Sequence, residues 1–405
     1  MTGMMSGVRV LEVAGWTYVP AAGAVLAEWG ADVIKVEHPE GGDPQRGLVT
    51  MGFVQAGPGG INHMIELPNR GKRSVGIDLK TERGRELLLR LAATSDVFLT
   101  NMRPAAISAL RLGVDDVRAV NPNIIYVRGT GQGVRGAESE KGGFDGSHFW
   151  VRTVAGIFET PEGEYPPSQP GPAWGDLQGG LAIAGGISAA LFHRERTGHA
   201  AVVDNSLMAN GMWAGSASLL ASGLFGIDQM PQMNRRNSPN PMVGLYRTKD
   251  NRFLSLMMLQ ADRWWPDLIV RLGRPDLGED PRFVDAAARR ANVGACIDEF
   301  DAIFATRTLA EWREALADAE GVWSAMETPG ELLTDPQALA NGYVRDVVSE
   351  AGATFRMIPS PLQFDETPPD LTRAPGHGEH TDEVLYELGL TEDEVIDLKI
   401  AGAVL

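Results

Sequence analysis

The stretch VRVLEVAGWTYVPAAGAVLAEWGADVIKVE, residues 8–37, decides the fold. It holds two apolar runs typical of strands, residues 8–13 and 31–37, and between them a helix expected to open at Pro20 and end at Gly30. Proline suits a first helical turn because the N–H that it lacks would have no partner there. Two strands joined through one helix form a βαβ unit, in which the strands pair in parallel across a right-handed crossover.

The alternation of strand and helix continues beyond this unit. Apolar runs predict strands at 75–79, 96–100, 124–128 and 200–203, with an amphipathic helix at 81–93. We therefore predict an α/β fold with a Rossmann-like, doubly wound parallel sheet. The first unit lacks the G-x-G-x-x-G fingerprint of dinucleotide-binding proteins. Glu37, at the end of the second strand, either holds a ribose or simply meets solvent.

Composition and charge limit the class of protein. The chain has 405 residues and a net charge of -17, so nucleic acid and anionic membranes are not expected partners. An anionic ligand would need a local basic patch. The single cysteine, Cys296, excludes an internal disulfide, and the seven scattered histidines predict no metal site and no tightly bound cofactor. Residues 1–7 are too short for a signal peptide and the apolar run 181–192 is too short for a membrane span, so we expect a cytoplasmic protein.

The composition divides the chain into three parts. Residues 1–224 are expected to form the first part of a large Rossmann-like domain, and residues 225–335 a smaller inserted α+β domain with its linkers. That small domain opens with a Met-, Pro- and Asn-rich linker, followed by a hairpin at 244–258 and helices at 262–272, 284–306 and 308–318. Residues 336–405 are predicted to return to the large domain and to end in helices at 381–388 and 391–401. Thr308 and Thr391 each open a capping box.

Asp176 is the candidate catalytic residue. It lies in the segment GDLQGG, residues 175–180, directly before the apolar run of a helix. One interpretation is a helix N-cap, whose side-chain oxygen accepts a backbone N–H. The other is a nucleophile, since a helix N-terminus stabilises the ionised carboxylate that attacks a carbonyl or thioester. The two interpretations are compatible, and the hexapeptide alone does not separate them.

A basic run stands out in this acidic chain. Arg70, Lys72 and Arg73 lie within four residues, next to a predicted strand. Such a run is either a solvated turn or a phosphate-binding site at the edge of the sheet. The loop 101–104 follows the strand 96–100, at the edge where open α/β sheets bind their ligands. The long glycine-rich loop 129–146 is a further candidate for a functional segment.

Taken together, these segments resemble the class III CoA-transferase family, the L-carnitine dehydratase and bile-acid-inducible type. That family includes formyl-CoA transferase and, as a divergent branch, α-methylacyl-CoA racemase. The resemblance follows the chain in order through residues 7–12, 30–37, 70–74, 101–104, 121–122, 143–145, 175–176, 194–198, 334–337 and 378–381. It implies an interlocked homodimer of ring-like subunits, with the active site where the large domain of one subunit meets the small domain of the other.

The resemblance also implies a chemistry. Asp176 matches the aspartate that attacks an acyl-CoA thioester, forms a mixed anhydride and then an aspartyl-CoA thioester, from which a carboxylic acid acceptor collects CoA. Glycine N–H groups near Asp176 are candidates for oxyanion stabilisation. The implied contacts to CoA are Gly15, Trp16, Thr17, Tyr18, His38, Arg70, Lys72, Arg73, Asn101, Met102 and Arg103, with Lys141 and Asp145 nearer the thioester. Arg111 is a further candidate phosphate ligand, although an ungapped comparison places the family's arginine at Ala109.

Three alternatives concern specificity and class. Racemases of the family carry a histidine where this chain has Phe144, which cannot transfer a proton, so racemisation would need His148 as a substitute. The glycine run of formyl-CoA transferases is absent from residues 257–262. Bulky side chains at Trp16, Tyr18, Phe149 and Trp150 either line a pocket for a larger acyl group or belong to the core. The alternative from another class, a nicotinamide-dependent oxidoreductase, is disfavoured by the missing fingerprint.

Overall fold

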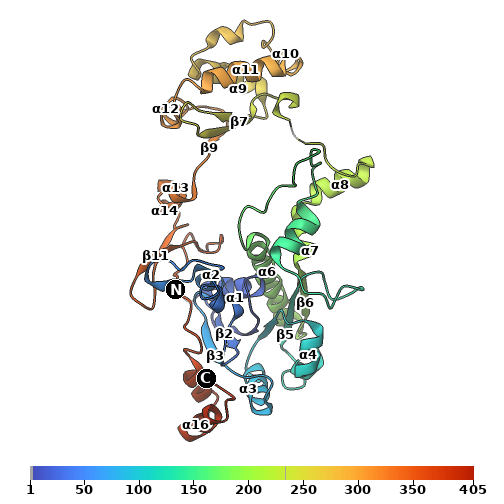
Figure 1. The fold of residues 1–405 in the computed structure, drawn as a ribbon, viewed down its shortest axis with the longest axis vertical. Helices are drawn as coiled ribbons and strands as arrows, with labels where there is room; N and C mark the ends of the chain where they lie inside the picture. Colours follow the sequence, from blue (N-terminus) through green and yellow to red (C-terminus); the bar gives the residue numbers. More distant parts are fainter. Residues whose placement is uncertain (1–2, 233) are drawn as a thin grey trace. The chain divides into compact units, whose positions relative to one another are not determined.

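The computed structural model describes residues 3–232 and 234–405, and Figure 1 shows the course of the chain. The chain divides into two compact units. The first contains the residues up to Met230 together with Pro336–Leu405, and the second is Pro231–Asp335. The first unit thus runs on to Met230, past residue 224, and the chain returns to it at Pro336.

A six-stranded parallel sheet forms the centre of the first unit, in the order β3-β2-β1-β4-β5-β6. The order reverses direction beside β1, which pairs with β2 on one side and β4 on the other. This confirms the predicted α/β class with a doubly wound parallel sheet. The strands are β1 (Arg9–Val13), β2 (Asp32–Glu37), β3 (Arg73–Gly76), β4 (Val97–Thr100), β5 (Ile125–Thr130) and β6 (Val202–Ser206).

Successive side chains of the strands enter two separate cores, because strand residues point alternately to opposite faces. Leu11 and Phe98 pack on one face with residues of α3 (Glu82–Ala93), α5 (Val114–Arg118), α15 (Thr381–Glu387) and α16 (Glu392–Ile400). Val10 and Val97 pack on the other face with α1 (Tyr18–Glu28) and α6 (Trp174–Thr197). Helices on both faces explain why the strands read as nearly continuous apolar runs.

The remaining elements of the first unit are short. They are α2 (His63–Asn69), α4 (Pro104–Leu110), α7 (Leu207–Ala214), α8 (Ser216–Phe225), α14 (Pro336–Ala340) and the antiparallel pair β10 (Arg345–Val348) and β11 (Thr354–Met357). No helix within the described ranges is both long enough and apolar enough to cross a membrane.

Several predicted bounds differ from those of the structure. Helix α1 begins at Tyr18, two residues before the proline that was expected to open it. Strand β3 covers Arg73–Gly76 instead of 75–79, because its pairing with β2 starts at Arg73. The loop expected at 129–146 begins only after Thr130, the end of β5, and leads into a π-helix, Asp145–Val154, which no sequence pattern predicted.

The second unit is a three-stranded antiparallel sheet packed against helices. Its strands are β7 (Val243–Arg247), β8 (Phe253–Met257) and β9 (Trp323–Ala325), in the order β7-β8-β9. The hairpin β7–β8 confirms the prediction for 244–258. The helices are α9 (Ala261–Arg271), α10 (Ala286–Ala291), α11 (Val293–Phe304), α12 (Leu309–Ala315) and α13 (Pro329–Leu332). The single helix predicted at 284–306 is therefore two helices, which meet at Asn292, while the capping boxes of Thr308 and Thr391 are confirmed.

Candidate active site

Three cavities follow one another in the first unit. Cavity A has a volume of about 830 Å³, cavity B about 610 Å³ and cavity C about 520 Å³. Gly15, Pro44, Met102 and Ala106 line both A and B. Trp16, Phe144 and Asp176 line both B and C. The cavities thus form a series A–B–C, with Asp176 where B meets C.

Cavity A lies at the carboxyl ends of β1, β2 and β3, where an open α/β sheet usually binds its ligand. Its lining includes the predicted residues His38 and Arg111. The lining also contains Lys80 and Arg85, two cations that the sequence analysis missed. Lys80 lies in the segment that follows the carboxyl end of β3 at Gly76, so the rule of strand ends could have identified it.

Asp176 is the third residue of α6, and the N-cap hypothesis is wrong. The N-cap position is Ala173, whose backbone is left-handed at φ 61° and whose side chain cannot cap. Leu177 N–H bonds the carbonyl of Ala173 at 3.0 Å, so the helix is closed by its backbone. No residue within the described ranges donates a hydrogen bond to the Asp176 carboxylate in this structure. The Asp176 carboxylate is therefore free to contact a ligand in cavity B or C.

Asp145 fixes the start of the helix that carries Asp176. Its Oδ1 accepts the Gly175 N–H at 2.9 Å, and its Oδ2 accepts Gln169 Nε2 at 2.5 Å. Asp145 is buried, and this burial raises the pKa of its carboxyl group. The Gly175 N–H is consequently not available to an oxyanion, whereas Gly142 and Gly143 line cavity B with their backbone.

Burial and, to a lesser extent, the nearby Asp145 carboxylate together raise the pKa of Asp176 to about 7. The helix N-terminus by itself favours the ionised form of Asp176. The desolvation and the second carboxylate outweigh the helix, so Asp176 exchanges its proton close to neutral pH. A carboxylate with such a pKa is a stronger nucleophile than one with the ordinary value, and perturbed groups of this kind are typical of functional sites.

Two glycines let aromatic rings approach the backbone of α6. A Cβ at Gly175 would overlap the ring of Phe149, and one at Gly179 would overlap the ring of Tyr18. Both rings are buried and belong to the same core, and Tyr18 also lines cavity B. Its hydroxyl group donates to Asn205 Oδ1 at 2.6 Å, and burial raises the pKa of this phenol.

The loop that bears Trp16 is held from two sides. Asn101 donates its Nδ2–H to the Gly15 carbonyl at 2.6 Å and accepts the Gly15 N–H at 3.1 Å. Asp43 Oδ1 accepts the Trp16 N–H at 3.2 Å. Trp16 has a left-handed backbone, φ 66°, which costs about 1 kcal/mol or more for a residue with a side chain. The side-chain oxygen and nitrogen of Asn101 thus both bond to Gly15, and these bonds fix the wall of the cavity.

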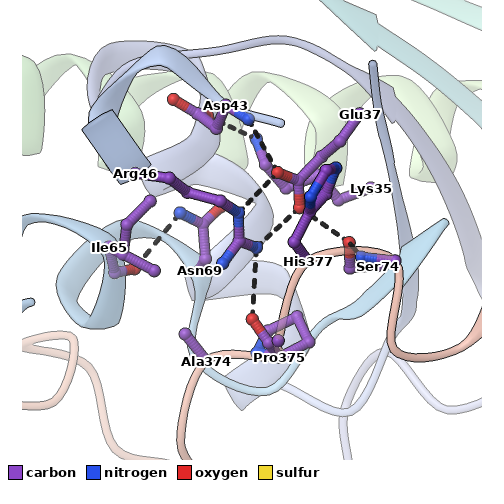
Figure 2. A network of polar contacts seen from close by, with 12 residues as sticks. Lys35, Glu37, Asp43, Arg46, Ile65, Asn69, Ser74, Ala374, Pro375 and His377 are labelled. Atoms are coloured by element: carbon purple, nitrogen blue, oxygen red, sulfur yellow. Dashed lines mark hydrogen bonds and ion pairs between the residues drawn. The ribbon is translucent and has the colours of Figure 1, made fainter. Parts of the chain in front are cut away.

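A buried network of charged side chains lies behind the loop that bears Trp16 and includes Asp43, which holds that loop (Figure 2). Lys35 pairs with Asp43 at 2.8 Å. Arg46 donates to both carboxylate oxygens of Glu37 at 2.7 Å, and Ser74 Oγ donates to Glu37 at 2.7 Å. Burial alone would raise the pKa of Glu37, but Arg46, Lys35 and Ser74 together lower it to about 2. The Glu37 carboxylate is therefore occupied within the protein, which argues against the ribose interpretation.

The basic run is also engaged internally. Arg70 pairs with Glu28, and Lys72 pairs with Glu12 at 2.7 Å. Arg73 pairs with three carboxylates, those of Asp32, Glu383 and Glu387. These side chains are therefore not a solvated turn, and none of the three lines cavity A, B or C. That they contact CoA stays a prediction.

Most of the other predicted site residues meet at the cavities. Tyr18, Asn101, Arg103 and Lys141 line B, Thr17 and Asp145 line C, His38 and Arg111 line A, and Gly15, Trp16, Met102 and Asp176 line two cavities each. Gln45 and Gln169, which line cavity C, were missed because nothing in their local sequence points to a pocket. His148 lies in none of the three linings; its Nδ1 lies 2.8 Å from Ser147 Oγ. Across the described residues, no group of three or more His, Cys, Asp or Glu side chains is arranged to hold a metal ion.

Comparison with known proteins gives the family. The model of CoA-transferase family III matches residues 5–381. The chain belongs to CoA-transferase family III. It is 31% identical to the cinnamoyl-CoA:phenyllactate CoA-transferase of Clostridium sporogenes, over 98% of this chain and 96% of that protein. It is 30% identical to the α-methylacyl-CoA racemase of mouse, over 98% of this chain and 96% of that protein.

A solved structure supports the same conclusion. The CAIB/BAIF family protein from Brucella suis superposes with a TM-score of 0.82 at 27% sequence identity, covering 96% of this chain and all of that one. The family therefore includes both CoA-transferases and a racemase, so the activity of this member must be argued from its own site.

Proposed function

We propose that this protein is a CoA-transferase that moves CoA from an acyl-CoA donor to a carboxylic acid through a covalent intermediate on Asp176. The observation that carries the proposal is the position of Asp176, at the junction of two cavities and free of hydrogen bonds from the described residues. Its pKa of about 7 leaves a large fraction ionised at neutral pH while keeping the carboxylate strongly nucleophilic.

The series of cavities matches the parts of an acyl-CoA. Cavity A offers three cations, Lys80, Arg85 and Arg111, for the adenosine phosphates in a strongly acidic protein, and His38 lies in the same lining. Cavity B, with Arg103 and Lys141, would take the pantetheine arm and bring the thioester to Asp176. Cavity C would take the acyl group. We do not include Arg70, Lys72 and Arg73 in this set, because carboxylates of the protein already engage them.

The chemistry balances without any further reactant. The Asp176 carboxylate attacks the thioester carbonyl, the CoA thiolate leaves, and an acyl–aspartyl anhydride forms. The thiolate then attacks the aspartyl carbonyl, which releases the donor acid and leaves an aspartyl-CoA thioester. The acceptor carboxylate attacks this thioester to give a second anhydride. The released thiolate attacks its acceptor carbonyl, which yields the new acyl-CoA and restores Asp176. Gly142 and Gly143 are the proposed donors to the oxyanions.

Racemisation would need a second group to exchange the α-proton with Asp176. Phe144 occupies the position of the family's histidine, and His148 does not line cavity B or C. We therefore place transfer before racemisation. Family membership over residues 5–381 likewise removes the reason to consider a nicotinamide-dependent oxidoreductase.

We further propose that the protein is a cytoplasmic homodimer. Light scattering after size-exclusion chromatography would test the dimer.

The test is chemical trapping. The protein is incubated with a panel of acyl-CoA donors and hydroxylamine, and its peptides are analysed by mass spectrometry. We expect an aspartyl hydroxamate at Asp176, absent from Asp176→Ala and retained in Asp228→Ala, the same change at an exposed aspartate. Absence of the adduct with every donor, together with exchange of the α-hydrogen in deuterated solvent, would replace transfer with racemisation.

A further inference from the structure

Two exposed aromatic rings stand where cavities B and C meet. The rings of Trp16 and Phe144 lie edge to face, with centroids 5.4 Å apart and planes at 86°. Phe144 is 59% exposed and Trp16 38% exposed, although both side chains are large and apolar. Apolar surface left open beside a candidate nucleophile is more typical of a binding site than of a core.

The backbone on both sides holds these rings in place. The Phe144 N–H donates to Ser147 Oγ at 3.2 Å, and the Phe144 carbonyl accepts the His148 N–H at 2.8 Å. On the other side, Asp43 and Asn101 fix the loop of Trp16 in its left-handed conformation. The pair is thus built on two fixed segments, and its rings remain open to a ligand.

The pair borders a cavity of suitable size and polarity. Cavity C measures about 520 Å³, within the range of ~300–1,000 Å³ that is usual for small organic ligands. Leu48, Met64 and Ala173 give it apolar walls, and Gln45 and Gln169 add polar side chains. In an edge-to-face pair only one face of one ring is used, so further ring faces remain for stacking.

We propose that Trp16 and Phe144 determine acyl specificity and that they select acyl groups with a planar aromatic ring, which stacks on Phe144 beside Asp176. This inference rests on the proposed function, because it assigns cavity C to the acyl group of a CoA thioester. A saturated ring of the same size fills the same volume but lacks the flat π face. The structure therefore predicts discrimination by aromaticity and not by size alone.

The test uses two unreactive thioethers, S-benzyl-CoA and S-(cyclohexylmethyl)-CoA, whose binding is measured by calorimetry. Since an aromatic pair contributes ~0.5–1.5 kcal/mol beyond burial, we expect the benzyl compound to bind the full-length protein about 2- to 10-fold more tightly. Phe144→Leu keeps an apolar side chain and should bring the ratio to about 1. The matched control is Phe192→Leu. Phe192 is an exposed phenylalanine of α6 that lines none of the three cavities, so this variant should leave the ratio of the two affinities unchanged.

The outcomes separate this inference from the proposed function. If the hydroxamate forms at Asp176 but Phe144→Leu keeps the aromatic preference, or wild type shows none, the inference is wrong and the proposed function stands. If the preference exists and Phe144→Leu removes it while no hydroxamate forms, the inference stands and covalent transfer is wrong. Failure of both thioethers to bind, together with the absence of the hydroxamate, would overturn the two together. Circular dichroism of each variant shows that the fold is retained.

Discussion

Replacing Asp176 by asparagine should stabilise the protein at the cost of its activity. In the unfolded chain an aspartate loses its proton at an ordinary pKa of about 3.9, whereas in the folded protein the pKa of Asp176 is about 7. The unfolded state therefore binds fewer protons than the folded state between these values, and stability falls as the pH rises through that window. Asparagine has a similar shape and no charge, so the variant avoids this loss.

The magnitude follows from the two pKa values. One pKa unit corresponds to about 1.4 kcal/mol, so the ionised Asp176 costs up to roughly 4 kcal/mol of unfolding free energy above pH 7. The advantage of Asp176→Asn should be close to zero at pH 4, about 1.5 kcal/mol at pH 5 and nearly complete at pH 8. For a unit of this size, about 4 kcal/mol corresponds to several degrees in Tm.

Calorimetric unfolding at pH 5, 6, 7 and 8 measures the effect. We expect the Tm of Asp176→Asn to exceed that of wild type by an amount that grows with pH. Asp228→Asn removes a charge at an exposed position and should show no such trend. A difference in Tm that does not change with pH, or a variant less stable than wild type at pH 8, would refute the reasoning about Asp176.

Three further changes test other parts of the site. Asp145→Asn removes the second cause of the raised pKa of Asp176, so the acid limb of the pH profile for adduct formation should move to lower pH; an unmoved limb contradicts the coupling. Lys72→Met leaves Glu12 with only one cation in a buried site and should cost about 3–5 kcal/mol in denaturant unfolding, and a neutral result would mean that the pair is not buried in solution. Gly179→Ala forces a methyl group onto a packed aromatic ring and should lower stability by about 1–3 kcal/mol, measured by thermal unfolding; an unchanged Tm would show that α1 and α6 can separate freely.

The sequence predicted the sheet well because its strands are buried on both faces. Runs such as VRVLEV carry their own signal, and the alternation with helices leaves few topologies to consider. The position of Asp176 at a helix start and the contribution of the loops 14–18 and 101–104 to the cavities were also predictable, since strand ends and helix starts meet at one edge.

Tertiary partners were not predictable from local patterns. Lys72 looks like any exposed lysine in sequence, and only the fold brings Glu12, sixty residues away along the chain, to its side. The pKa of Asp176 depends on Asp145, a residue on a different segment, and on burial that the hexapeptide does not reveal. The π-helix 145–154 lacks a sequence signature of its own, so its role in presenting Phe144 became visible only in the structure.

The edge of the sheet at β3 is covered by the last residues of the chain, which are synthesised last. Leu405 N–H bonds the Gly76 carbonyl at 3.1 Å, and Asp78 N–H bonds the Ala403 carbonyl at 2.9 Å. Ile77 also pairs with Val404 in an antiparallel bridge, and Val384 and Val395 complete the core on that face. A ribosome adds about 5–20 residues per second. Residues 403–405 are therefore synthesised roughly 10–35 s after Met230, and until then the edge strand β3 lacks these partners. During that time the edge at β3 and its apolar face lack the segments that cover them in the folded protein, and an uncovered strand edge of this kind can pair with neighbouring chains.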